Sequence, residues 1–246
     1  QFQSDLSRLV LVPVLQMVVK FLAWVLTIDF FISQDYFNTE FAIIISMENE
    51  RPKSKQPIPE HAKRVFKGVI FDVYQWEQEM YDGTKRTFEK LKRADTVTVF
   101  SVLPDGKILL TEQEQPGNDE PFLAAIGGRI DEGEDILSAA KRELLEESGY
   151  EAKEFILWDS QQPTAKIEYA VYTFVAKGLK KVAEMNLDRG EKIKLLPVTL
   201  EELISIATDG RKKFAEKEIM HKLFEAKINP KKREELEKLF KPSDKN

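Results

Sequence analysis

Cysteine is absent from this 246-residue chain, and histidine occurs only twice, at His61 and His221. The absence of cysteine excludes a disulfide framework, a thiol nucleophile, a zinc-thiolate site and an iron–sulfur cluster. Two histidines are too few for a His-rich metal site. Any metal must therefore be bound by oxygen ligands, and the 42 Asp and Glu residues of the chain supply them.

An excess of basic residues is also lacking, because 37 Lys and Arg face 42 Asp and Glu and the formal net charge is −5. A general nucleic-acid binder needs basic surface to neutralise phosphates, so we expect no nucleic-acid partner. The hydrophobic fraction of 42% is that of an ordinary globular chain, long enough for one large domain or two small ones. Collagen-like, low-complexity and mainly disordered classes are excluded.

Residues 1–46 carry only six charged side chains, whereas the other 200 residues carry 73. Within them residues 9–32 are strongly apolar, but Lys20 and Asp29 interrupt the run and leave pieces too short to span a bilayer. Three interpretations stay open: a membrane anchor, a buried hydrophobic helix, and a segment that does not belong to the working protein. We expect a cytoplasmic protein, with membrane contact through residues 9–32 only if residues 1–46 are native.

Turn signals and composition divide the rest of the chain. We predict a Pro-rich linker over 47–63, a strand pair over 64–93, a main domain over 94–208 and charged helices over 209–246. Strands and helices do not alternate regularly, which indicates an α+β fold. The expected strands are residues 66–80, 84–92, 96–103, 107–111, 122–126, 155–158, 167–176 and 192–197. The expected helices are residues 134–148, 200–208, 212–226 and 230–240.

Residues 128–150, GRIDEGEDILSAAKRELLEESGY, are the stretch with the clearest chemistry. Gly127 and Gly128 permit a tight turn and a close backbone approach before the helix. Gly149 is expected to end that helix. A helix that follows a glycine turn is therefore expected here.

Three glutamates of this helix, Glu143, Glu146 and Glu147, fall at positions i, i+3 and i+4 and share one face. Like charges at that spacing destabilise a helix unless something offsets them. A bound divalent cation would do so, and carboxylates suit Mg²⁺ or Mn²⁺, which bridge to substrate phosphates. A solvated acidic helix face is the alternative interpretation.

The spacing G-x5-E-x7-R-E-U-x-E-E-x-G-U resembles the Nudix box, and only Tyr150 departs from it, where an aliphatic residue is usual. Seven fixed residues at fixed spacing arise by chance on the order of once in ten million windows. The matching residues are Gly128, Glu134, Arg142, Glu143, Leu144, Glu146, Glu147 and Gly149.

The resemblance implies an α/β/α sandwich around a mixed β-sheet, with an N-terminal β-hairpin extension and C-terminal helices. It also implies hydrolysis of a nucleoside diphosphate linked to a group X, with Mg²⁺ or Mn²⁺ as cofactor. By resemblance, Glu143, Glu146 and Glu147 are metal ligands together with the backbone carbonyl of Gly127.

The remaining box residues have structural roles in that family. By resemblance, Glu134 and Arg142 form a pair in which the arginine orients the acids of the helix. Gly128 and Gly149 are the box glycines at the two ends of the motif.

Catalysis requires a carboxylate that takes a proton from the attacking water. In Nudix enzymes this base is a box glutamate or one in a later loop, so Glu147, Glu143 and Glu191 are the catalytic candidates. Glu191 precedes the last expected strand, as the loop glutamate does in ADP-ribose pyrophosphatases. Glu184 and Asp188 are its rivals.

Several features resemble the branch of ADP-ribose pyrophosphatases and nucleoside diphosphate sugar hydrolases. In that branch an N-terminal strand pair often builds a dimer and part of the adenine site. Trp76 and Phe88 of the strand pair are therefore candidates for substrate binding, as is Arg129 beside the box. Packing within a sheet core is the alternative for the two aromatic residues.

Two departures from that branch leave the identity of X open. Residues 112–115 read EQEQ and lack an expected basic residue, and residues 124–128 read AAIGG and lack a glutamate often used for binding. We expect a nucleotide as substrate, ADP-ribose or a related nucleotide sugar, and a homodimer. The alternatives are a dinucleoside polyphosphate or nucleoside triphosphate pyrophosphohydrolase, and a non-catalytic nucleotide-sensing module.

Overall fold

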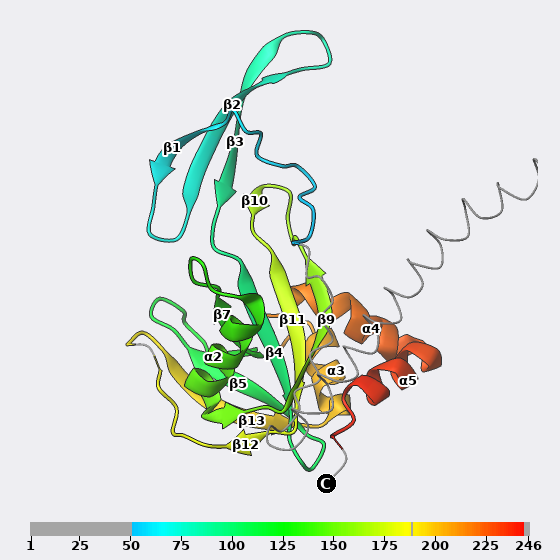
Figure 1. The fold of residues 1–246 in the computed structure, drawn as a ribbon. Coiled ribbons are helices and arrows are strands. Elements are labelled where there is room, and N and C mark those ends of the chain that lie inside the picture. Colours follow the sequence, from blue (N-terminus) through cyan, green and yellow to red (C-terminus); the bar gives the residue numbers. More distant parts are fainter. Residues whose placement is uncertain (1–50, 188, 244–246) are drawn as a thin grey trace, which may run out of the picture. The chain divides into compact units, whose positions relative to one another are not determined.

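The computed structural model describes residues 51–187 and 189–243, so the predictions for residues 1–46 lie outside the described residues. A mixed seven-stranded sheet forms the centre of the described region (Figure 1). Its order is β13-β5-β4-β11-β9, with β6 paired to β5 and β7 paired to β4. The strands are β4 (Thr96–Val102), β5 (Ile108–Glu114), β6 (Phe122–Ala124), β7 (Ile126–Arg129), β9 (Glu154–Gln161), β11 (Val171–Lys177) and β13 (Lys192–Val198).

β4 and β11 form the parallel pair in the middle of this sheet, with Val99 opposite Phe174. Both strands are rich in β-branched and aromatic residues, which suit a pleated surface covered on both faces. Every residue of β11 is buried, and so is every residue of β4 after Thr96. Both faces of the sheet must therefore be covered by other elements.

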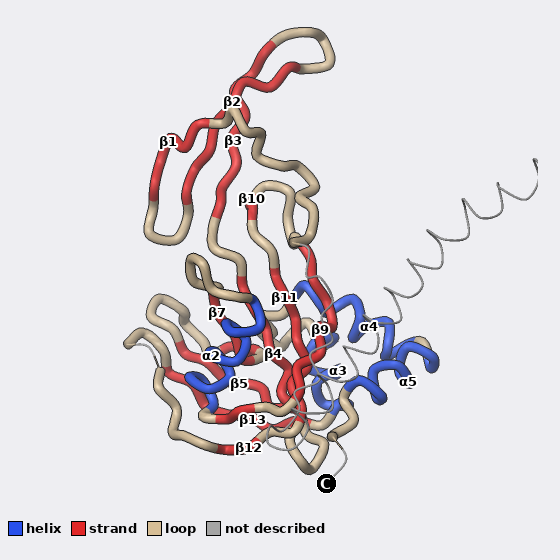
Figure 2. Tube along the Cα trace, in the orientation of Figure 1, coloured by secondary structure: helices blue, strands red, loops and turns tan. Residues whose placement is uncertain are grey.

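Helices cover the two faces, as Figure 2 shows. Ala140 and Leu144 of one helix pack with Val97 and Val99 on the first face. Three further helices pack around Phe100 on the second face. The architecture is the α+β class and α/β/α sandwich predicted from the sequence. The helices are α2 (Ile136–Ser148) on the first face, and α3 (Leu200–Thr208), α4 (Met220–Ile228) and α5 (Pro230–Leu239) on the second.

Helix α2 has a defined cap at each end. The Asp135 carboxylate accepts a hydrogen bond from the Ser138 N–H, 3.0 Å away, and so satisfies a free amide of the first turn. The helix therefore begins at Ile136 and leaves Glu134, which was predicted to be helical, in the preceding turn. At the other end Gly149 has a φ of 69°, where a side chain would be strained, and a Cβ there would overlap the Ala183 carbonyl oxygen.

A second sheet has the order β1-β2-β3-β10. The single strand predicted over 66–80 is wrong, because the Gly68 N–H bonds the Phe71 carbonyl at 3.0 Å and closes a turn between two strands. The single strand predicted over 167–176 is also split, since its first residues pair with β3 and the rest pair with β4. The strands are β1 (Lys63–Lys67), β2 (Asp72–Glu79), β3 (Lys85–Lys92) and β10 (Ile167–Glu168).

The helix predicted over 212–226 begins later than expected. The Leu123 N–H of β6 bonds the Lys213 carbonyl at 2.7 Å, and the Ala215 N–H bonds the Leu123 carbonyl at 2.8 Å. These backbone groups pair with a strand and cannot join a helix. A 3₁₀ turn over Lys217–Ile219 then leads into α4. The described elements end with a two-stranded antiparallel sheet, formed by β8 (Tyr150–Glu151) and β12 (Lys180–Lys181).

A buried ion cluster joins the segment before β1 to the second sheet. The Lys90 ammonium, with a side chain only 1% exposed, lies 2.6 Å from the Glu168 carboxylate. Arg51 donates to Glu168 at 2.8 Å and also forms a two-bond contact with Asp95 at 2.9 and 3.0 Å. Burial opposes ionisation of Glu168, but hydrogen bonds from Lys90, Ser54, Arg51 and Gln162 lower its pKa to about 2.

In the described part of the chain, no helix is both long and apolar enough to cross a membrane.

Candidate active site

Strand β7 and helix α2 approach each other closely at the box glycines. Gly127 and Gly128 lie within β7, opposite Thr98 and Val97 of β4, rather than in the predicted tight turn. Both positions require glycine because neighbouring atoms leave no space for a side chain. A Cβ on Gly127 would overlap the Val97 carbonyl oxygen, and a Cβ on Gly128 would overlap the Glu143 carboxylate.

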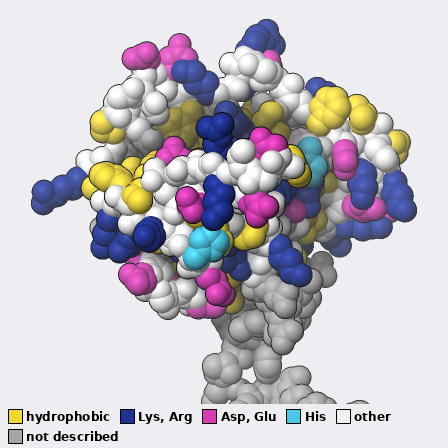
Figure 3. All heavy atoms as spheres, turned by 90° about the horizontal axis from the view of Figure 1, so that it is seen from above, with side chains coloured by type: hydrophobic (Ala, Val, Ile, Leu, Met, Phe, Trp, Pro, Cys, Tyr) yellow, Lys and Arg dark blue, Asp and Glu magenta, His cyan; other side chains and the backbone are white. Residues whose placement is uncertain are grey.

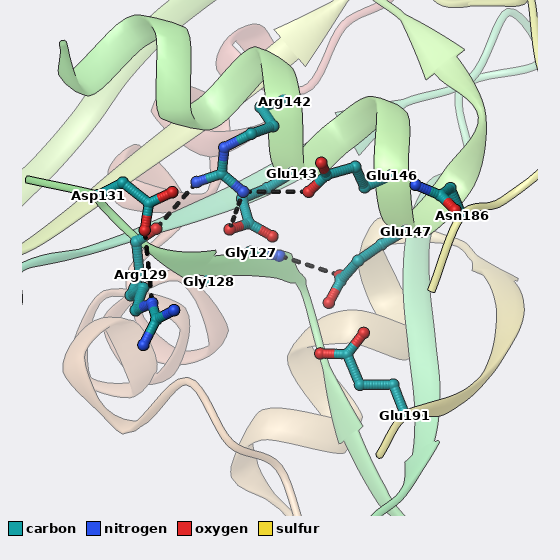
Figure 4. Close-up of a pocket in the computed structure, with 10 residues that line it drawn as sticks. All are labelled: Gly127, Gly128, Arg129, Asp131, Arg142, Glu143, Glu146, Glu147, Asn186 and Glu191. Atoms are coloured by element: carbon teal, nitrogen blue, oxygen red, sulfur yellow. Dashed lines mark hydrogen bonds and ion pairs between the residues drawn. The ribbon is translucent and has the colours of Figure 1, made fainter. Parts of the chain in front are cut away.

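A polar cavity of about 480 Å³ lies where these two elements meet (Figure 4). Five carboxylates line it: Glu143, Glu146 and Glu147 from α2, Asp131 from the turn after β7, and Glu191 from the loop before β13. Figure 4 shows Glu191 on the opposite side of the cavity from α2, with its carboxylate directed toward that of Glu147. The structure therefore brings together the three box glutamates and the loop glutamate that were predicted from the sequence.

Arg142 holds two of these acids in place. Its Nε and Nη2 each lie 2.9 Å from the Glu134 carboxylate, and its Nη1 lies 2.8 Å from Glu143 and 3.0 Å from Glu146. The Nη2 also donates to the Arg129 carbonyl oxygen at 3.0 Å. The planar guanidinium suits such a fork, which a lysine could not reproduce. The hydrogen bonds from Arg142 lower the pKa of Glu134.

Glu147 is the most deeply placed of the five acids, with 4% of its surface exposed. Its Oε2 accepts a hydrogen bond from the Gly127 N–H at 3.1 Å. Burial raises the pKa of Glu147 to about 8, and the charges of Glu143, Glu191 and Glu216 add to the shift. Burial also raises the pKa of Glu143, although Arg142 opposes it. The acids that line the cavity nevertheless outnumber its two cations, Arg129 and Arg142.

The loop that carries Glu191 is anchored to the end of α2. The Asn186 N–H donates to the Glu146 carbonyl oxygen at 2.8 Å, and the Val182 N–H donates to the Gly149 carbonyl oxygen at 2.9 Å. Of the two rivals of Glu191, Glu184 is not among the residues that line the cavity, and Asp188 lies outside the described residues.

Glu216 is a residue of this region that sequence analysis missed. Its carboxylate accepts from the Ala125 N–H at 3.0 Å and from the Thr98 hydroxyl at 3.3 Å, directly behind Gly127. The residue keeps some exposed surface, but desolvation of its carboxylate raises its pKa to about 7. In the sequence it is one acid among many in a charged stretch. Only the pairing of residues 213–215 with β6 brings it to the site.

The donor set fits a hard divalent cation, since it consists of carboxylates and a backbone carbonyl around an excess of negative charge. The described residues nevertheless contain no group of three His, Cys, Asp or Glu side chains that converge on one point. Arg142 explains this, because it already draws Glu143 and Glu146 to its guanidinium. A cation would therefore compete with Arg142 for these two carboxylates.

The three candidate substrate residues lie in different places. Arg129 lines the cavity, is exposed, and has its Nε 3.5 Å from Asp131. Trp76 and Phe88 lie opposite each other in the second sheet, with ring centroids 6.0 Å apart, and neither lines the cavity. Trp76 is 6% exposed and donates its indole N–H to Gln78 at 3.1 Å.

Comparison with known proteins agrees with this geometry. The model of the NUDIX domain matches residues 92–237, and the chain therefore belongs to the Nudix family and is a Nudix hydrolase. An ADP-ribose pyrophosphatase of Bacillus subtilis is 27% identical over 146 residues, which is 58% of this chain and 79% of that protein.

Two further proteins are similar to this chain. A methanol dehydrogenase activator of Bacillus methanolicus is 28% identical over 152 residues, 61% of this chain and 82% of that protein. The crystal structure of an ADP compounds hydrolase matches with a TM-score of 0.58 at 22% identity. It covers 74% of this chain and 97% of its own, and it supports the fold alone.

Proposed function

We propose that this Nudix hydrolase cleaves the pyrophosphate bond of ADP-ribose or a related nucleotide sugar, with Mg²⁺ or Mn²⁺ as cofactor. The observation that carries the proposal is the single cavity in which Glu143, Glu146 and Glu147 of α2 face Glu191 beside the backbone of Gly127. In the reaction a water oxygen bonds to one phosphorus and the bridging oxygen leaves with the other. ADP-ribose and water thus give AMP and ribose 5-phosphate.

Glu143, Glu146, Glu147 and the carbonyl of Gly127 would hold the cation. When bound, the cation neutralises phosphate oxygens and lowers the pKa of a coordinated water. The chain itself contributes orientation. The Gly127 N–H fixes the Glu147 carboxylate, and Arg142 limits the positions that Glu143 and Glu146 can take.

Two carboxylates are placed to accept the proton of the attacking water. Glu147 is held deep in the cavity by Gly127, and Glu191 enters from the opposite side on the anchored loop. Glu143, the third candidate for the base, is held by Arg142 at 2.8 Å, so Glu147 and Glu191 are proposed ahead of it. The two are separated by replacing each in turn with glutamine and recording kcat against pH. We expect the fall of kcat at low pH to disappear only in the variant that has lost the base.

We propose ADP-ribose as the substrate because the relative that matches this chain over 79% of its own length is an ADP-ribose pyrophosphatase.

We also propose a homodimer, in which the outer strand β1 supplies the contact. Val65 and Phe66 of this edge strand are 52% and 59% exposed, and an exposed apolar edge favours pairing. Light scattering of the purified chain measures the mass directly, and a monomer at all concentrations would contradict the dimer.

The activity is tested on the full chain with Mg²⁺ and, separately, Mn²⁺. ADP-ribose, ADP-glucose, GDP-mannose, diadenosine polyphosphates and dGTP are offered, and products are separated by chromatography. Glu147→Gln is the inactive variant, and Glu151→Gln, an exposed acid on β8, is its matched control. The proposal is supported if the wild type and Glu151→Gln release AMP from ADP-ribose and Glu147→Gln does not. It is rejected if the wild type hydrolyses none of these compounds.

A further inference from the structure

A second cavity, of about 790 Å³, adjoins the first between the second sheet and β7. Arg129 lines both cavities, so the two meet at this side chain. Its volume lies within the range of about 300–1,000 Å³ that small-molecule sites occupy. A substrate that begins at the acidic cavity therefore has room for a further group beyond Arg129.

Positive charge dominates the wall of this second cavity. Five cationic side chains line it, whereas only two carboxylates, Asp72 and Glu132, do so. Figure 3 shows the molecule from above, with Lys and Arg side chains interspersed with Asp and Glu over this end. The cations are Arg64, Lys67, Lys92, Arg93 and Arg129.

Three of these cations form no ion pair with the described residues. Arg64 pairs with Asp72 at 3.1 Å, but Lys67, Lys92 and Arg93 make no ion pair within residues 51–187 and 189–243. The Arg93 guanidinium lies over the Tyr169 ring at 5.0 Å, and its Nε is buried without a hydrogen-bond partner. A buried donor without a partner is costly unless a ligand satisfies it.

Apolar side chains complete the wall. Val69 and Ile70 line the cavity and are 96% and 63% exposed. The ring of Tyr74 also lines it, with the Lys92 ammonium 6.0 Å from the ring centroid. A sugar or a base can pack on such a surface while an attached anion meets the cations.

We propose that the second cavity binds a phosphate ester that the substrate carries outside the pyrophosphate to be cleaved. This inference rests on the proposed function and narrows its substrate class to nucleotides with an additional phosphate. A phosphate monoester carries a charge of about −1.5 to −2 at pH 7, and three charge-assisted hydrogen bonds would satisfy it. A neutral sugar would leave Lys67, Lys92 and Arg93 without a counter-charge.

The test compares three compounds that differ by one group: ADP-ribose, ADP-ribose with a 2′-phosphate on the adenosine, and ADP-ribose with a 1″-phosphate on the distal ribose. Binding to the full chain is measured by calorimetry in EDTA, where no metal supports turnover. We expect one phosphorylated compound to bind at least about tenfold more tightly than ADP-ribose, with an advantage that shrinks at high salt.

The matched variants are Lys67→Ala/Lys92→Ala, which removes two cations of the second cavity, and Lys85→Ala, an exposed lysine of β3 outside it. We expect the double variant to lose the advantage of the phosphorylated compound and still to bind ADP-ribose, and Lys85→Ala to keep the advantage. Equal affinity for the three compounds, an advantage that survives in the double variant, or no binding of any compound would overturn the inference.

Hydrolysis of the same compounds with Mg²⁺ or Mn²⁺ separates this inference from the proposed function. Turnover with equal affinities rejects the anion site and leaves the pyrophosphohydrolase. A phosphate-dependent gain in affinity without turnover keeps the anion site and rejects the hydrolysis of these compounds.

Discussion

Glu147 is bound by the backbone of Gly127, since its Oε2 lies 3.1 Å from the Gly127 N–H across the gap between α2 and β7. This single contact links the deepest acid of the helix to the residue whose carbonyl is a proposed metal ligand. It places both groups in a fixed relation before any cation arrives.

The stability of the metal-free protein should depend on the ionisation of Glu147. Its folded pKa of about 8 exceeds the ordinary value of 4.5, so the folded state retains a proton that the unfolded chain has released. The free energy of unfolding should therefore fall as pH rises from 4.5 to 8. Glu147→Gln should reduce this slope, to which Glu143 and Glu216 also contribute, and be more stable than the wild type at pH 8 by on the order of 1–3 kcal/mol. Urea unfolding in EDTA measures this, and an unchanged slope would contradict the burial described here.

Replacement of Gly128 by alanine should inactivate the enzyme without unfolding it. The new Cβ would overlap the Glu143 carboxylate and displace it, and a displacement of about 1 Å can lower the rate about 100-fold. Gly210→Ala is the control, because nothing lies within 4 Å of a Cβ at that position. The measurement is kcat together with the far-ultraviolet circular dichroism. Full activity in Gly128→Ala would show that Glu143 is free to move.

Replacement of Arg142 by lysine should separate charge from geometry. Lysine keeps the positive charge but cannot reach Glu134, Glu143 and Glu146 together as the guanidinium does. We expect kcat to fall about tenfold or more, with a higher metal concentration needed for half-maximal rate. Lys141→Arg, an exposed neighbour, should leave both quantities unchanged. A wild-type rate in Arg142→Lys would reduce the role of Arg142 to its charge.

Glu216 should act as a positioning residue for the strand junction behind the cavity. Glu216→Ala removes the acceptor of the Ala125 N–H and should lower kcat about tenfold, with KM nearly unchanged. Glu216→Gln retains an acceptor oxygen and should restore most of the rate. Glu218→Ala, two residues later, serves as the control. If alanine and glutamine at position 216 behave alike, the hydrogen bond to Ala125 is not what matters.

The buried pair of Lys90 and Glu168 should be costly to break. Lys90→Met leaves Glu168 without its closest cation, and removal of one partner of a buried pair costs about 3–5 kcal/mol. Because the pKa of Glu168 is lowered to about 2, its stabilising effect is complete above pH 4.5 and is lost as pH falls toward 2. Acid unfolding midpoints of the wild type and of Lys90→Met measure this. A shared midpoint would contradict the assignment.

The sequence predicted the layers of the fold and the acids of α2, since both depend on local patterns. Buried β-branched strands, capping residues and the spacing of Glu143, Glu146 and Glu147 are visible within a few residues. It did not predict the turn after Gly68 or the late start of α4, because a tertiary backbone contact decides each. Glu216 was missed for the same reason. The role of Arg129 at the boundary of two cavities also depends on strands far apart in the chain.

The pairing of residues 213–215 with β6 also bears on how the chain can be shortened. β6 pairs with β5 on one side, and this short segment covers backbone groups on its other side. A truncation after Thr208 would remove both Glu216 and this cover, and an uncovered strand is a template for aggregation. The C-terminal residues thus protect the edge of the sheet from pairing with other chains. Loss of solubility on truncation would therefore carry no information about their part in catalysis.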